Sequence, residues 1–429
     1  MQSRESRKTR ILFRQTVSNR FTLPVLLAAL ERSGITRDIT PGIVNNRPEL
    51  ERALRDHTPA LIAYGFMTPH TAEVWEEVRR VKQAGSGRTV WVAGGPHPTG
   101  DPESAFRMGF DVVAAGEGEE IFPRLCGDFL EKGAAVTGQI YKPETPFPLD
   151  ESRPISPLAD LVPPLEITRG CFYRCRFCQT GSEKPRHRSP ASVREYMEML
   201  KTRDLLFRAG FICPSGFEYG AERPGDVRPE RIEMLLRTAK EAGIRHLEYG
   251  VFPTEIRPET VTPEMLVVIK KWCSNRKITL GGQTGSEPLI RRIRRGHTRD
   301  RIDRAAAYIH EAGFKPQIDI ILGFPDETPE DRRETLDWMK RLGRRFPVRI
   351  HVHYFLPLAG TDYADADPRP LEPEIKKRLE AYHKAGICND WWKRGEMMSR
   401  KIVQTRAALR SPCNPSFGMT GSVKENKIL

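Results

Sequence analysis

The sequence predicts an α/β protein with two parallel-sheet domains. Strand-like apolar runs alternate with amphipathic helices from residue 10 to residue 365, and this alternation is typical of parallel sheets built from βαβ units. A stretch rich in Pro and Gly separates the two series. A chain of 429 residues also exceeds one typical domain. We therefore expect a Rossmann-like doubly wound sheet over residues 1–132, a linker over 133–165, a partial (β/α)6 barrel over 166–365 and a small C-terminal extension over 366–429.

In the first domain, short apolar runs predict strands and amphipathic segments predict helices. The expected strands cover residues 11–13, 60–64, 90–93 and 111–115, and the expected helices cover 22–33, 48–56 and 71–84. Ligands of such sheets bind at the carboxyl ends of the strands. The residues that follow each strand are therefore the candidate binding residues of this domain.

Glycines and polar residues gather at three of these strand ends. Glycine lets the backbone approach a flat or bulky ligand that side chains would block. Taken singly, each glycine is better explained by a tight turn between strand and helix. Taken together, they predict a ligand-binding edge formed by Thr68, Gly94, Gly95, His97, Gly116, Glu117 and Gly118.

The second domain repeats a strand-plus-helix unit six times. The expected strands lie at residues 164–170, 210–213, 246–249, 278–280, 317–322 and 348–353. In a barrel of this kind the chemistry lies on the loops at the carboxyl ends of the strands. His351 and His353 share one face of the last strand, where they serve either as satisfied core groups or at the barrel mouth.

Three cysteines directly follow the first strand of this second domain. Cys171, Cys175 and Cys178 are spaced so that each thiolate can take one corner of a [4Fe-4S] cluster, and no fourth cysteine lies nearby in the sequence. The open iron would then be free to bind a substrate. The alternative is structural zinc, which fills all four positions with paired ligands. Only His187 is close enough in the sequence to act as a fourth zinc ligand.

Composition sets further limits. The mean hydropathy is −0.51 and the longest apolar stretch, residues 21–30, is far too short to span a membrane. The basic N-terminus lacks a signal-peptide pattern, and the eight cysteines do not form a disulfide framework. We therefore expect a cytoplasmic protein. Basic and acidic residues are interleaved along the helices as on solvated helix faces, so the net charge of +13 only weakly indicates nucleic acid, and an acidic protein partner would account for it equally well. Nucleic acid is not the expected partner.

The cysteine motif at the end of a first barrel strand resembles that of the radical S-adenosylmethionine (SAM) enzymes. In that family SAM binds the open iron of the cluster. Residues 283–286 are similar to the family's Gly-x-Gln-Ser-Gly-Ser stretch, and residues 320–325 to the strand that packs on adenine. The family's Gly-Gly-Glu stretch has no clean copy, and residues 215–218 give only its approximate position. The resemblance implies SAM contacts at Phe177, Glu218, Glu255, Gln283, Ser286 and Leu322. For Gln283 and Ser286 the alternative role is to cap the following helix.

The glycine-rich strand ends of the first domain resemble the cobalamin-binding domain that precedes many radical SAM barrels. The resemblance implies that the loops containing Thr68, Gly95 and Gly116 hold the corrin and its nucleotide tail. The Asp-x-His-x-x-Gly motif of the wider cobalamin family is absent from the sequence. Cobalamin is therefore expected to bind without a lower histidine ligand from that motif.

Together the two resemblances imply a cobalamin-dependent radical SAM C-methyltransferase. One SAM would methylate cobalamin, and a second would yield a 5'-deoxyadenosyl radical that removes hydrogen from an unactivated sp3 carbon. Residues 299–300, 324–328 and 353–361 are similar to a subgroup from methanogenic archaea. One branch of that subgroup methylates the α carbon of a glutamine in methyl-coenzyme M reductase, which gives the leading expected substrate. An electron donor such as ferredoxin is also implied.

Three alternatives remain open. A tRNA methylthiotransferase shares the cysteine motif and a similar glutamine loop, but it needs three further cluster cysteines, and residues 1–170 contain only Cys126. A second alternative is a radical SAM enzyme that does not methylate, with cobalamin in another role. The non-enzymatic alternative is an RNA-binding protein stabilised by zinc.

Overall fold

The computed structural model describes residues 8–55, 60–84, 89–159, 161–203 and 208–411, and the chain divides into two compact units. The first unit comprises Met1–Pro163, Leu358–Ala364 and Lys401–Leu429, and the second comprises Pro164–Pro357 and Asp365–Arg400. The chain thus enters the second unit twice and returns to the first unit twice.

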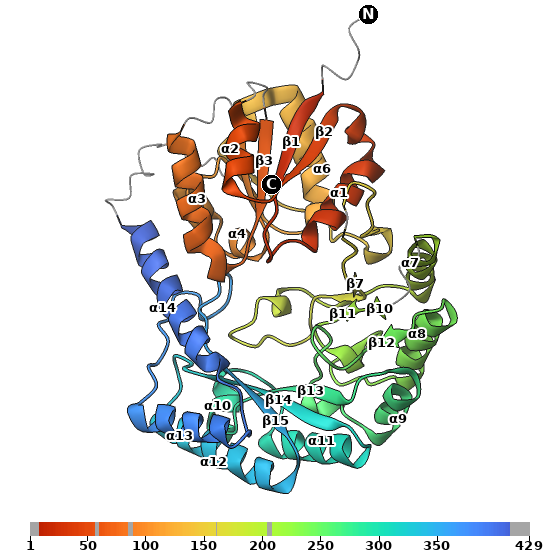
Figure 1. Ribbon diagram of the computed structural model, residues 1–429, viewed down its shortest axis with the longest axis vertical. Helices are drawn as coiled ribbons and strands as arrows, with labels where there is room; N and C mark the ends of the chain where they lie inside the picture. Colours follow the sequence, from red (N-terminus) through yellow and green to blue (C-terminus); the bar gives the residue numbers. More distant parts are fainter. Residues whose placement is uncertain (1–7, 56–59, 85–88, 160, 204–207, 412–429) are drawn as a thin grey trace, which may run out of the picture. The chain divides into compact units, whose positions relative to one another are not determined.

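The first unit is built on a parallel six-stranded sheet with the order β2-β1-β3-β4-β5-β6 (Figure 1). Its strands are β1 (Thr9–Arg14), β2 (Ile39–Val44), β3 (Ala60–Gly65), β4 (Val90–Gly94), β5 (Val112–Ala114) and β6 (Ile140–Tyr141). Its helices are α1 (Thr22–Ser33), α2 (Arg47–Arg55), α3 (Thr71–Gln83), α4 (Pro96–Gly100), α5 (Pro102–Arg107) and α6 (Gly118–Lys132). Cys413 and the rest of residues 412–429 lie outside the described residues.

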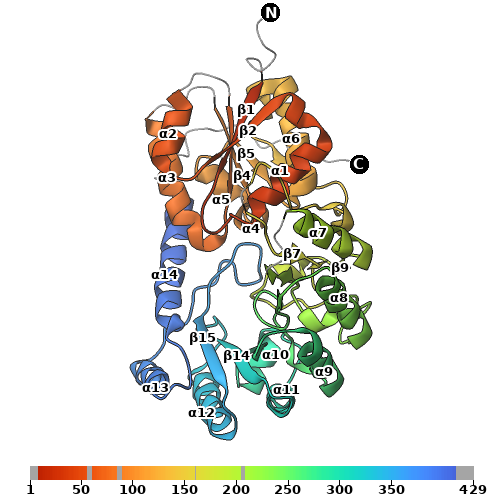
Figure 2. The same cartoon turned by 45° about the vertical axis from the view of Figure 1, so that its right-hand side comes forward.

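Helices cover both faces of this sheet (Figure 2). Successive side chains of a strand point to opposite faces. In β1, Phe13 packs in the core that includes residues of α1 and α6, whereas Leu12 packs in the core that includes residues of α3. The predicted doubly wound sheet is therefore confirmed.

The structure differs from the sequence prediction between residues 133 and 163. This stretch, expected as a linker, belongs to the first unit, and its strand β6 pairs with β5. Strand β2 was not predicted, because it contains Pro41 and Gly42, which disfavour a strand interior. Proline is tolerated there because β2 is an edge strand of the sheet.

The second unit contains six extended segments that pair in parallel and in chain order. β7 (Leu165–Glu166) pairs with β11 (Phe211–Ile212), and β10 (Arg208–Ala209) pairs with β12 (His246–Leu247). Ile256, in the segment after β12, forms a parallel bridge with Leu280 of β13 (Lys277–Gln283). β13 pairs with β14 (Lys315–Leu322), which in turn pairs with β15 (Arg349–Tyr354). This is the strand order expected for a partial (β/α)6 barrel.

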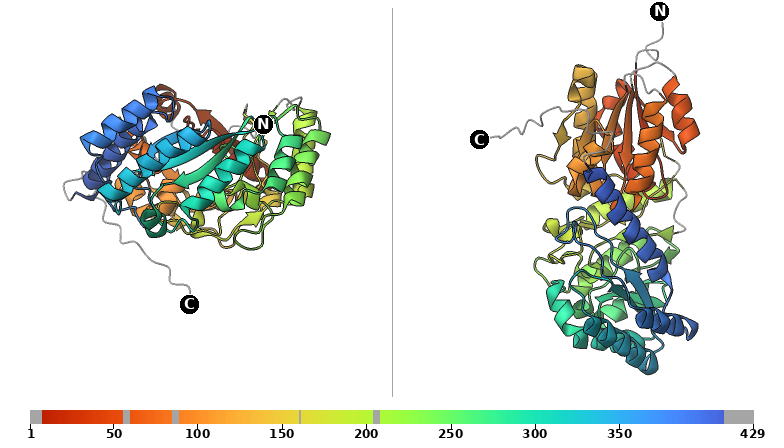
Figure 3. Two further views of the ribbon diagram at one scale, coloured as in Figure 1. Left: turned by 90° about the horizontal axis from the view of Figure 1, so that it is seen from below. Right: turned by 90° about the vertical axis from the view of Figure 1, so that its left-hand side faces the viewer.

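Helices follow these strands and lie side by side along the unit, from green to blue in the left panel of Figure 3. They are α7 (Pro190–Thr202), α8 (Pro229–Glu241), α9 (Pro263–Trp272), α10 (Glu287–Arg292), α11 (Arg299–Glu311), α12 (Pro329–Arg345), α13 (Pro373–Lys384) and α14 (Trp391–Arg410). Helix α14 contributes to both units, because the boundary falls between Arg400 and Lys401. Within the described ranges, no helix combines the length and apolar character needed to cross a membrane.

Several helices of the second unit begin with a Ser-Pro or Thr-Pro pair. Ser189, Thr262 and Thr328 each accept a hydrogen bond from a backbone N–H of the first turn, and proline occupies the next position. The cap satisfies an otherwise unpaired N–H, and proline lacks one. These local signals explain why the helix starts were predictable.

Candidate active site

The three cysteines lie in a tight loop between two short antiparallel strands, β8 (Thr168–Arg169) and β9 (Arg186–His187). The Cys171 N–H donates to the Glu183 carbonyl at 3.0 Å, and the Cys178 N–H donates to the Cys175 carbonyl at 3.1 Å. A Cβ on Gly181 would lie 2.0 Å from the Tyr173 carbonyl oxygen, so only glycine fits there. The loop therefore folds back on itself and keeps its three thiols together.

Burial raises the pKa of the Cys171 thiol, and the neighbouring thiols of Cys175 and Cys178 add to the increase. Cys213 also lies within electrostatic reach of Cys171. However, Cys213 is fully buried and donates to the Ser215 carbonyl, and burial raises its pKa to about 12. Its Sγ is engaged with the Ser215 carbonyl in the core, so the candidate ligands are the three motif cysteines.

Positively charged groups surround the cysteine loop. Arg295 Nη1 lies 3.6 Å from Cys175 Sγ, and the Arg257 guanidinium lies over the Tyr173 ring, 3.3 Å from its centroid. Arg257 Nη1 is buried and has no hydrogen-bond partner among the residues that the structure describes. Buried unpaired donors are costly, and an anionic cluster with three thiolates would satisfy them. The residues present thus fit a [4Fe-4S] cluster.

His297 adds a second unpaired nitrogen beside these arginines. Its Nε2 is buried without a partner in the described part of the chain. Burial, assisted by the charges of Arg295 and Arg257, lowers the pKa of His297 to about 3. The imidazole is therefore neutral beside the two arginines.

The zinc alternative required His187 as a fourth ligand. In the structure, His187 Nδ1 lies 3.0 Å from Thr168 Oγ1 and Nε2 lies 3.0 Å from the Ala221 carbonyl oxygen. Both ring nitrogens are thus engaged. The loop lacks the closed tetrahedral set that structural zinc needs.

Two of the predicted SAM residues contact the cysteine loop or its aromatic neighbours. Phe177 packs against Phe324, with ring centroids 5.5 Å apart, and Phe324 comes two residues after Leu322, the last residue of β14. Glu218 is buried and accepts a hydrogen bond from the Tyr173 hydroxyl at 2.9 Å. Glu218 also accepts from the Gly225 N–H at 2.7 Å, so it braces the loop from outside the cysteine motif.

Gln283 has a strained backbone. Its φ is +68°, a value in the left-handed region that costs a residue with a side chain about 1–2 kcal/mol. It lies at an irregularity in the pairing of β13 with β14. A Cβ on Gly281 would meet both Gln283 Nε2, at 2.8 Å, and Arg295 Nη2, at 2.6 Å. The strained residue therefore lies beside the arginine that reaches Cys175, and strain of this kind clusters at functional sites.

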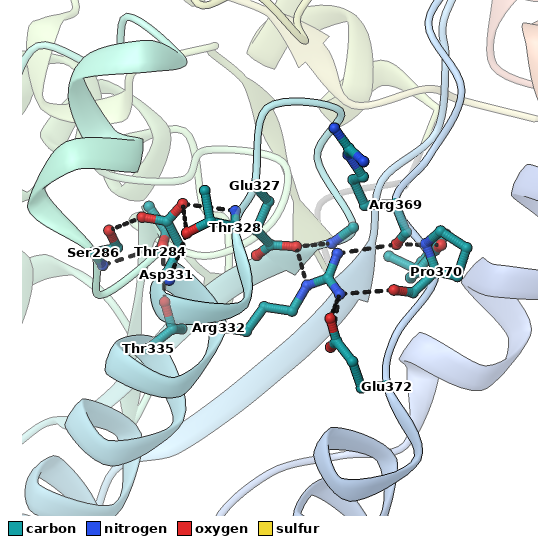
Figure 4. Close-up of polar contacts among 12 residues, drawn as sticks. Thr284, Ser286, Glu327, Thr328, Asp331, Arg332, Thr335, Arg369, Pro370 and Glu372 are labelled. Atoms are coloured by element: carbon teal, nitrogen blue, oxygen red, sulfur yellow. Dashed lines mark hydrogen bonds and ion pairs between the residues drawn. The ribbon is translucent and has the colours of Figure 1, made fainter.

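Ser286 has a structural role (Figure 4). It is fully buried, caps α10 by accepting from the Leu289 N–H at 3.3 Å, and donates to Asp331 in the first turn of α12. This is the capping role considered as the alternative. Its contact with SAM remains a prediction.

A buried ion-pair network fixes the loop after β14 (Figure 4). Arg332 Nε lies 2.8 Å from Glu327 Oε2, and its Nη1 lies 2.8 Å from Glu372. Arg332 also donates to the backbone carbonyls of Arg369 and Pro370. Burial raises the pKa of Glu327 to about 7, and Arg332 offsets only part of this increase. This network was not predicted, because its members are far apart in the sequence.

Glu255, the remaining predicted SAM residue, belongs to a polar cluster with Asp319, His351 and His353. Burial and then the charge of Asp319 raise the pKa of Glu255 to about 7. Burial acts to raise the pKa of Asp319 as well, but the two histidines outweigh it, and the net shift is downward. Glu255 also experiences the charge of Arg295, which links this cluster to the cysteine loop.

In the first unit, the predicted binding residues meet at the carboxyl ends of β3, β4 and β5. Thr68 and His97 are in contact, with Thr68 Oγ1 3.1 Å from His97 Nδ1, and His97 Nε2 lies 3.1 Å from Ser104 Oγ. Burial lowers the pKa of His97 to about 4. His97 is thus a neutral, buried group with both nitrogens hydrogen-bonded, and it is not free to act as a metal ligand.

The glycines of this edge differ in whether a side chain would fit at their positions. Gly95 has a φ of +93°, and a Cβ there would lie 3.0 Å from the Phe66 backbone. A Cβ on Gly116 would lie 2.8 Å from Pro143 Cδ, and one on Gly118 would lie 2.6 Å from Leu26 Cδ2. These three positions need glycine for internal packing. A Cβ on Gly94 would meet nothing nearer than 3.7 Å among the described residues.

Glu117 is also engaged within the first unit. Its carboxylate accepts a hydrogen bond from the Phe147 N–H at 2.5 Å. It thereby holds the segment that was expected to be a linker. Direct contact between Glu117 and cobalamin remains a prediction.

The same edge of the sheet fits a bulky, flat and partly apolar group. Val17 and Phe21 follow β1, Met67 follows β3, and all three side chains are exposed. Exposed apolar side chains gathered at a strand edge indicate a binding surface. Contact between this edge and a corrin ring remains a prediction.

The sequence did not single out Arg257, Arg295 or His297. Arg295 and His297 belong to the run Arg294-Arg-Gly-His297. Its basic character and its closeness in the sequence to residues 283–286 could have marked it as part of the site. Arg257 lies two residues after Glu255, with no local mark of its role. Their convergence on the cysteine loop depends on the tertiary fold.

Comparison with protein families gives a separate result for each unit. Residues 165–339 match the radical SAM superfamily, and residues 19–126 match the B12 binding domain. The first matched range contains all three motif cysteines, and the second contains the strand ends described above.

Similar proteins include an uncharacterised protein of Methanopyrus kandleri, 23% identical over 348 residues that cover 68% of this chain and 65% of that protein. A tRNA-2-methylthio-N(6)-dimethylallyladenosine synthase of Syntrophomonas wolfei is 28% identical over 64% of this chain and 60% of that protein. The chain thus spans less than two thirds of the length of these relatives.

Two solved structures share the fold. The radical SAM methyltransferase TsrM of Kitasatospora setae, with cobalamin and a [4Fe-4S] cluster bound, has a TM-score of 0.58 and 16% identity, covering 83% of this chain and 77% of that one. The cobalamin-dependent SAM radical enzyme OxsB, with aqua-cobalamin bound, has a TM-score of 0.59 and 15% identity, covering 78% and 52%.

Proposed function

The chain combines a B12 binding domain with a radical SAM domain, and from this premise we propose that it is a cobalamin-dependent radical SAM C-methyltransferase. When bound, the cluster with SAM supplies a carbon-centred radical, and cobalamin supplies the methyl group. The acceptor would be an unactivated sp3 carbon. Such chemistry belongs to the cofactors, and the protein binds, orients and shields them.

The observation that carries the proposal is the electropositive setting of the cysteine loop. Arg295 reaches Cys175, and Arg257 and His297 leave buried nitrogens unpaired beside it. This setting favours an anionic three-thiolate cluster and leaves one iron without a protein ligand. Cys171, Cys175 and Cys178 would hold the cluster.

The proposed SAM contacts surround the same loop. Phe177 and Leu322 would pack on the apolar parts of SAM, while Glu218, Glu255 and Gln283 would orient its polar groups. In the first unit, the carboxyl edge with Thr68, Gly94 and Gly95 would hold cobalamin. Holding both reactive groups against one carbon is the main contribution that positioning makes to the rate.

We further propose that the acceptor is a protein residue, with the α carbon of a glutamine in methyl-coenzyme M reductase as the leading case. The support is the similarity of residues 299–300, 324–328 and 353–361 to the methanogen subgroup. The net charge of +13 would attract an acidic electron donor such as ferredoxin.

The tRNA methylthiotransferase alternative is less well supported, although such proteins are among the relatives. It needs a second cluster, whereas the only cysteine in residues 1–170 is Cys126. Cys126 is buried in α6, and burial raises its pKa to about 12. A lone buried thiol cannot hold a cluster.

The test is anaerobic incubation of reconstituted protein with cobalamin, SAM, a reductant and a glutamine-containing peptide. We expect S-adenosylhomocysteine and 5'-deoxyadenosine to form together, with one CH2 group added to the peptide by mass spectrometry. Cys175→Ala should abolish 5'-deoxyadenosine, whereas Cys273→Ala, outside the motif, should retain it. Formation of only one of the two SAM products by the wild-type protein would contradict the two-SAM mechanism.

A further inference from the structure

A group of ligand-type side chains lies on one face of the sheet formed by β13, β14 and β15. Asp319 on β14 is paired in register with His351 on β15, and His353 lies two residues further along the same face. The opposite face carries fully buried apolar side chains such as Ile320 and Val352. The ligand-type side chains therefore share one face of β14 and β15, and apolar side chains lie on the other.

The ligand atoms of these three residues converge. Asp319 Oδ1 lies 3.3 Å from His351 Nδ1 and 4.0 Å from His353 Nε2, and all three atoms lie within 4.8 Å of one another. Separations of this size are those between atoms that share one metal ion at about 2.0–2.2 Å.

Both histidines lie close to the Asp319 carboxylate and lower its pKa, but its Oδ1 has no well-formed hydrogen bond in the described part of the chain. Asp319 is 8% exposed. A buried carboxylate oxygen without a donor is costly. Its lone pairs, and the nearby imidazole nitrogens, point to a missing cation.

A second carboxylate increases the need for positive charge. Glu255 lies within electrostatic reach of Asp319, and two buried carboxylates close together repel unless a proton or a cation lies between them. Arg295, whose charge also acts on Glu255, already binds the Gly281 carbonyl at 2.8 Å and Cys175 Sγ at 3.6 Å. It is therefore committed to the cysteine loop.

Trp391, the first residue of α14, covers the histidines. Its ring centroid lies 4.7 Å from that of His351 and 5.7 Å from that of His353. An aromatic ring packed beside both imidazoles limits their rotation, and a fixed ring orientation favours metal binding.

We propose that Asp319, His351 and His353 bind one divalent first-row transition-metal ion. Two imidazoles with one carboxylate form a donor set that suits Fe2+, Mn2+ or Zn2+. The set leaves coordination positions open, so the ion can hold an oxygen of a second molecule. This site is separate from the cysteine loop, and its existence does not depend on methyl transfer.

The test uses the full chain with its iron-sulfur cluster reconstituted, then freed of other metals by brief chelation and desalting. Mn2+ is added, and the electron paramagnetic resonance signal of free Mn2+ reports how much is bound. We expect one Mn2+ to bind per chain. Asp319→Asn and His351→Ala should weaken this binding at least tenfold.

Matched controls are available on the surface of the same unit. Asp300→Asn and His310→Ala change exposed side chains of α11 and should leave Mn2+ binding unchanged. Iron and sulfide content and the unfolding midpoint establish that each variant is folded. The proposal is overturned if the wild-type protein binds no Mn2+, or if Asp319→Asn and His351→Ala bind it as well as the surface variants. Because the readout is binding, this result is independent of whether methyl transfer is detected.

Discussion

Arg295 connects the cysteine loop to strand β13: its Nη1 lies 3.6 Å from Cys175 Sγ, while its Nη2 donates to the Gly281 carbonyl at 2.8 Å. Positive charge beside the cysteine sulfur favours the reduced, more negative form of a cluster held there. The interaction would therefore raise the reduction potential of such a cluster as well as hold the loop.

Replacing Arg295 should make the cluster harder to reduce. For Arg295→Gln we expect the midpoint potential to fall by roughly 60 mV, which is equivalent to about 1.4 kcal/mol for one electron. Anaerobic redox titration measures the change. Arg291→Gln, which removes an exposed charge near the end of α10, is the control and should leave the potential unchanged. An unshifted potential in a fully loaded Arg295→Gln protein would show that the contact has no electrostatic role.

Because the backbone of Gln283 is left-handed, replacing it by glycine should relieve strain while weakening SAM binding. Gln283→Gly should unfold at a higher free energy than Gln283→Ala by about 1 kcal/mol, because glycine adopts positive φ without strain. Both variants should bind SAM more weakly than the wild-type protein, since both lack the amide. Urea unfolding and equilibrium dialysis with SAM measure the two quantities. Wild-type SAM affinity in either variant would remove Gln283 from the SAM site.

Removing one partner of the buried pair of Glu327 and Arg332 should lower the free energy of unfolding strongly. Glu327→Ala leaves a buried guanidinium with reduced compensation, and we expect a loss of about 3 kcal/mol in the free energy of unfolding. Glu330→Ala, on the helix α12 that carries Arg332, removes an exposed ion pair with Arg333. Apart from helix propensity, it should lower the free energy of unfolding by less than about 1 kcal/mol. If urea unfolds Glu327→Ala and Glu330→Ala with the same free energy, the buried network stabilises the protein no more than an exposed ion pair does.

Buried His97 predicts acid sensitivity. Its pKa is lowered from 6.5 to about 4 in the folded protein, so between these values the unfolded chain binds a proton that the folded protein does not. Stability from this group is fully present above pH 6.5 and falls by about 1.4 kcal/mol per pH unit as the pH drops toward 4.

His97→Gln should remove this part of the pH dependence while retaining a side chain that can hydrogen-bond to Thr68 and Ser104. The free energy of unfolding of both proteins should be measured from pH 7.5 to pH 4.5. Parallel curves for the variant and the wild-type protein would contradict the assignment.

Local sequence signals predicted the elements whose determinants are themselves local. Helix α1 was expected at residues 22–33 and is observed over Thr22–Ser33, because an amphipathic run there ends at a glycine in the left-handed conformation. The cysteine loop was predictable for the same reason, since its three ligands and its glycines lie within a dozen residues.

The surroundings of the site were not predictable in this way. Arg257 and Arg295 lie about 80 and 120 residues beyond the cysteines, and only the packing of successive strand-helix units brings them to the loop. For Ser286 the sequence could not decide between two roles. Its sequence context suits both a SAM contact and a helix cap, and only its burial against Asp331 reveals the cap.

The return of the chain to its first unit also escaped prediction, because it depends on close backbone contact. The Ala359 N–H donates to Thr68 Oγ1 at 3.1 Å, and a Cβ on Gly100 would lie 2.5 Å from the Ala359 backbone. Residues 358–364 have no composition that marks them as part of the first unit. Their place follows from a fit that exists only in three dimensions.

This return imposes an order on biosynthesis. Leu409, near the end of α14, packs in the same core as Trp91 and Val78, so this core gains one of its side chains only after the segments of the second unit have been made. Domains that emerge first usually fold first, but here the last contribution to the first core comes from a helix that follows the second unit. A nascent chain that ends before residue 401 would therefore lack the Leu409 contact with this core.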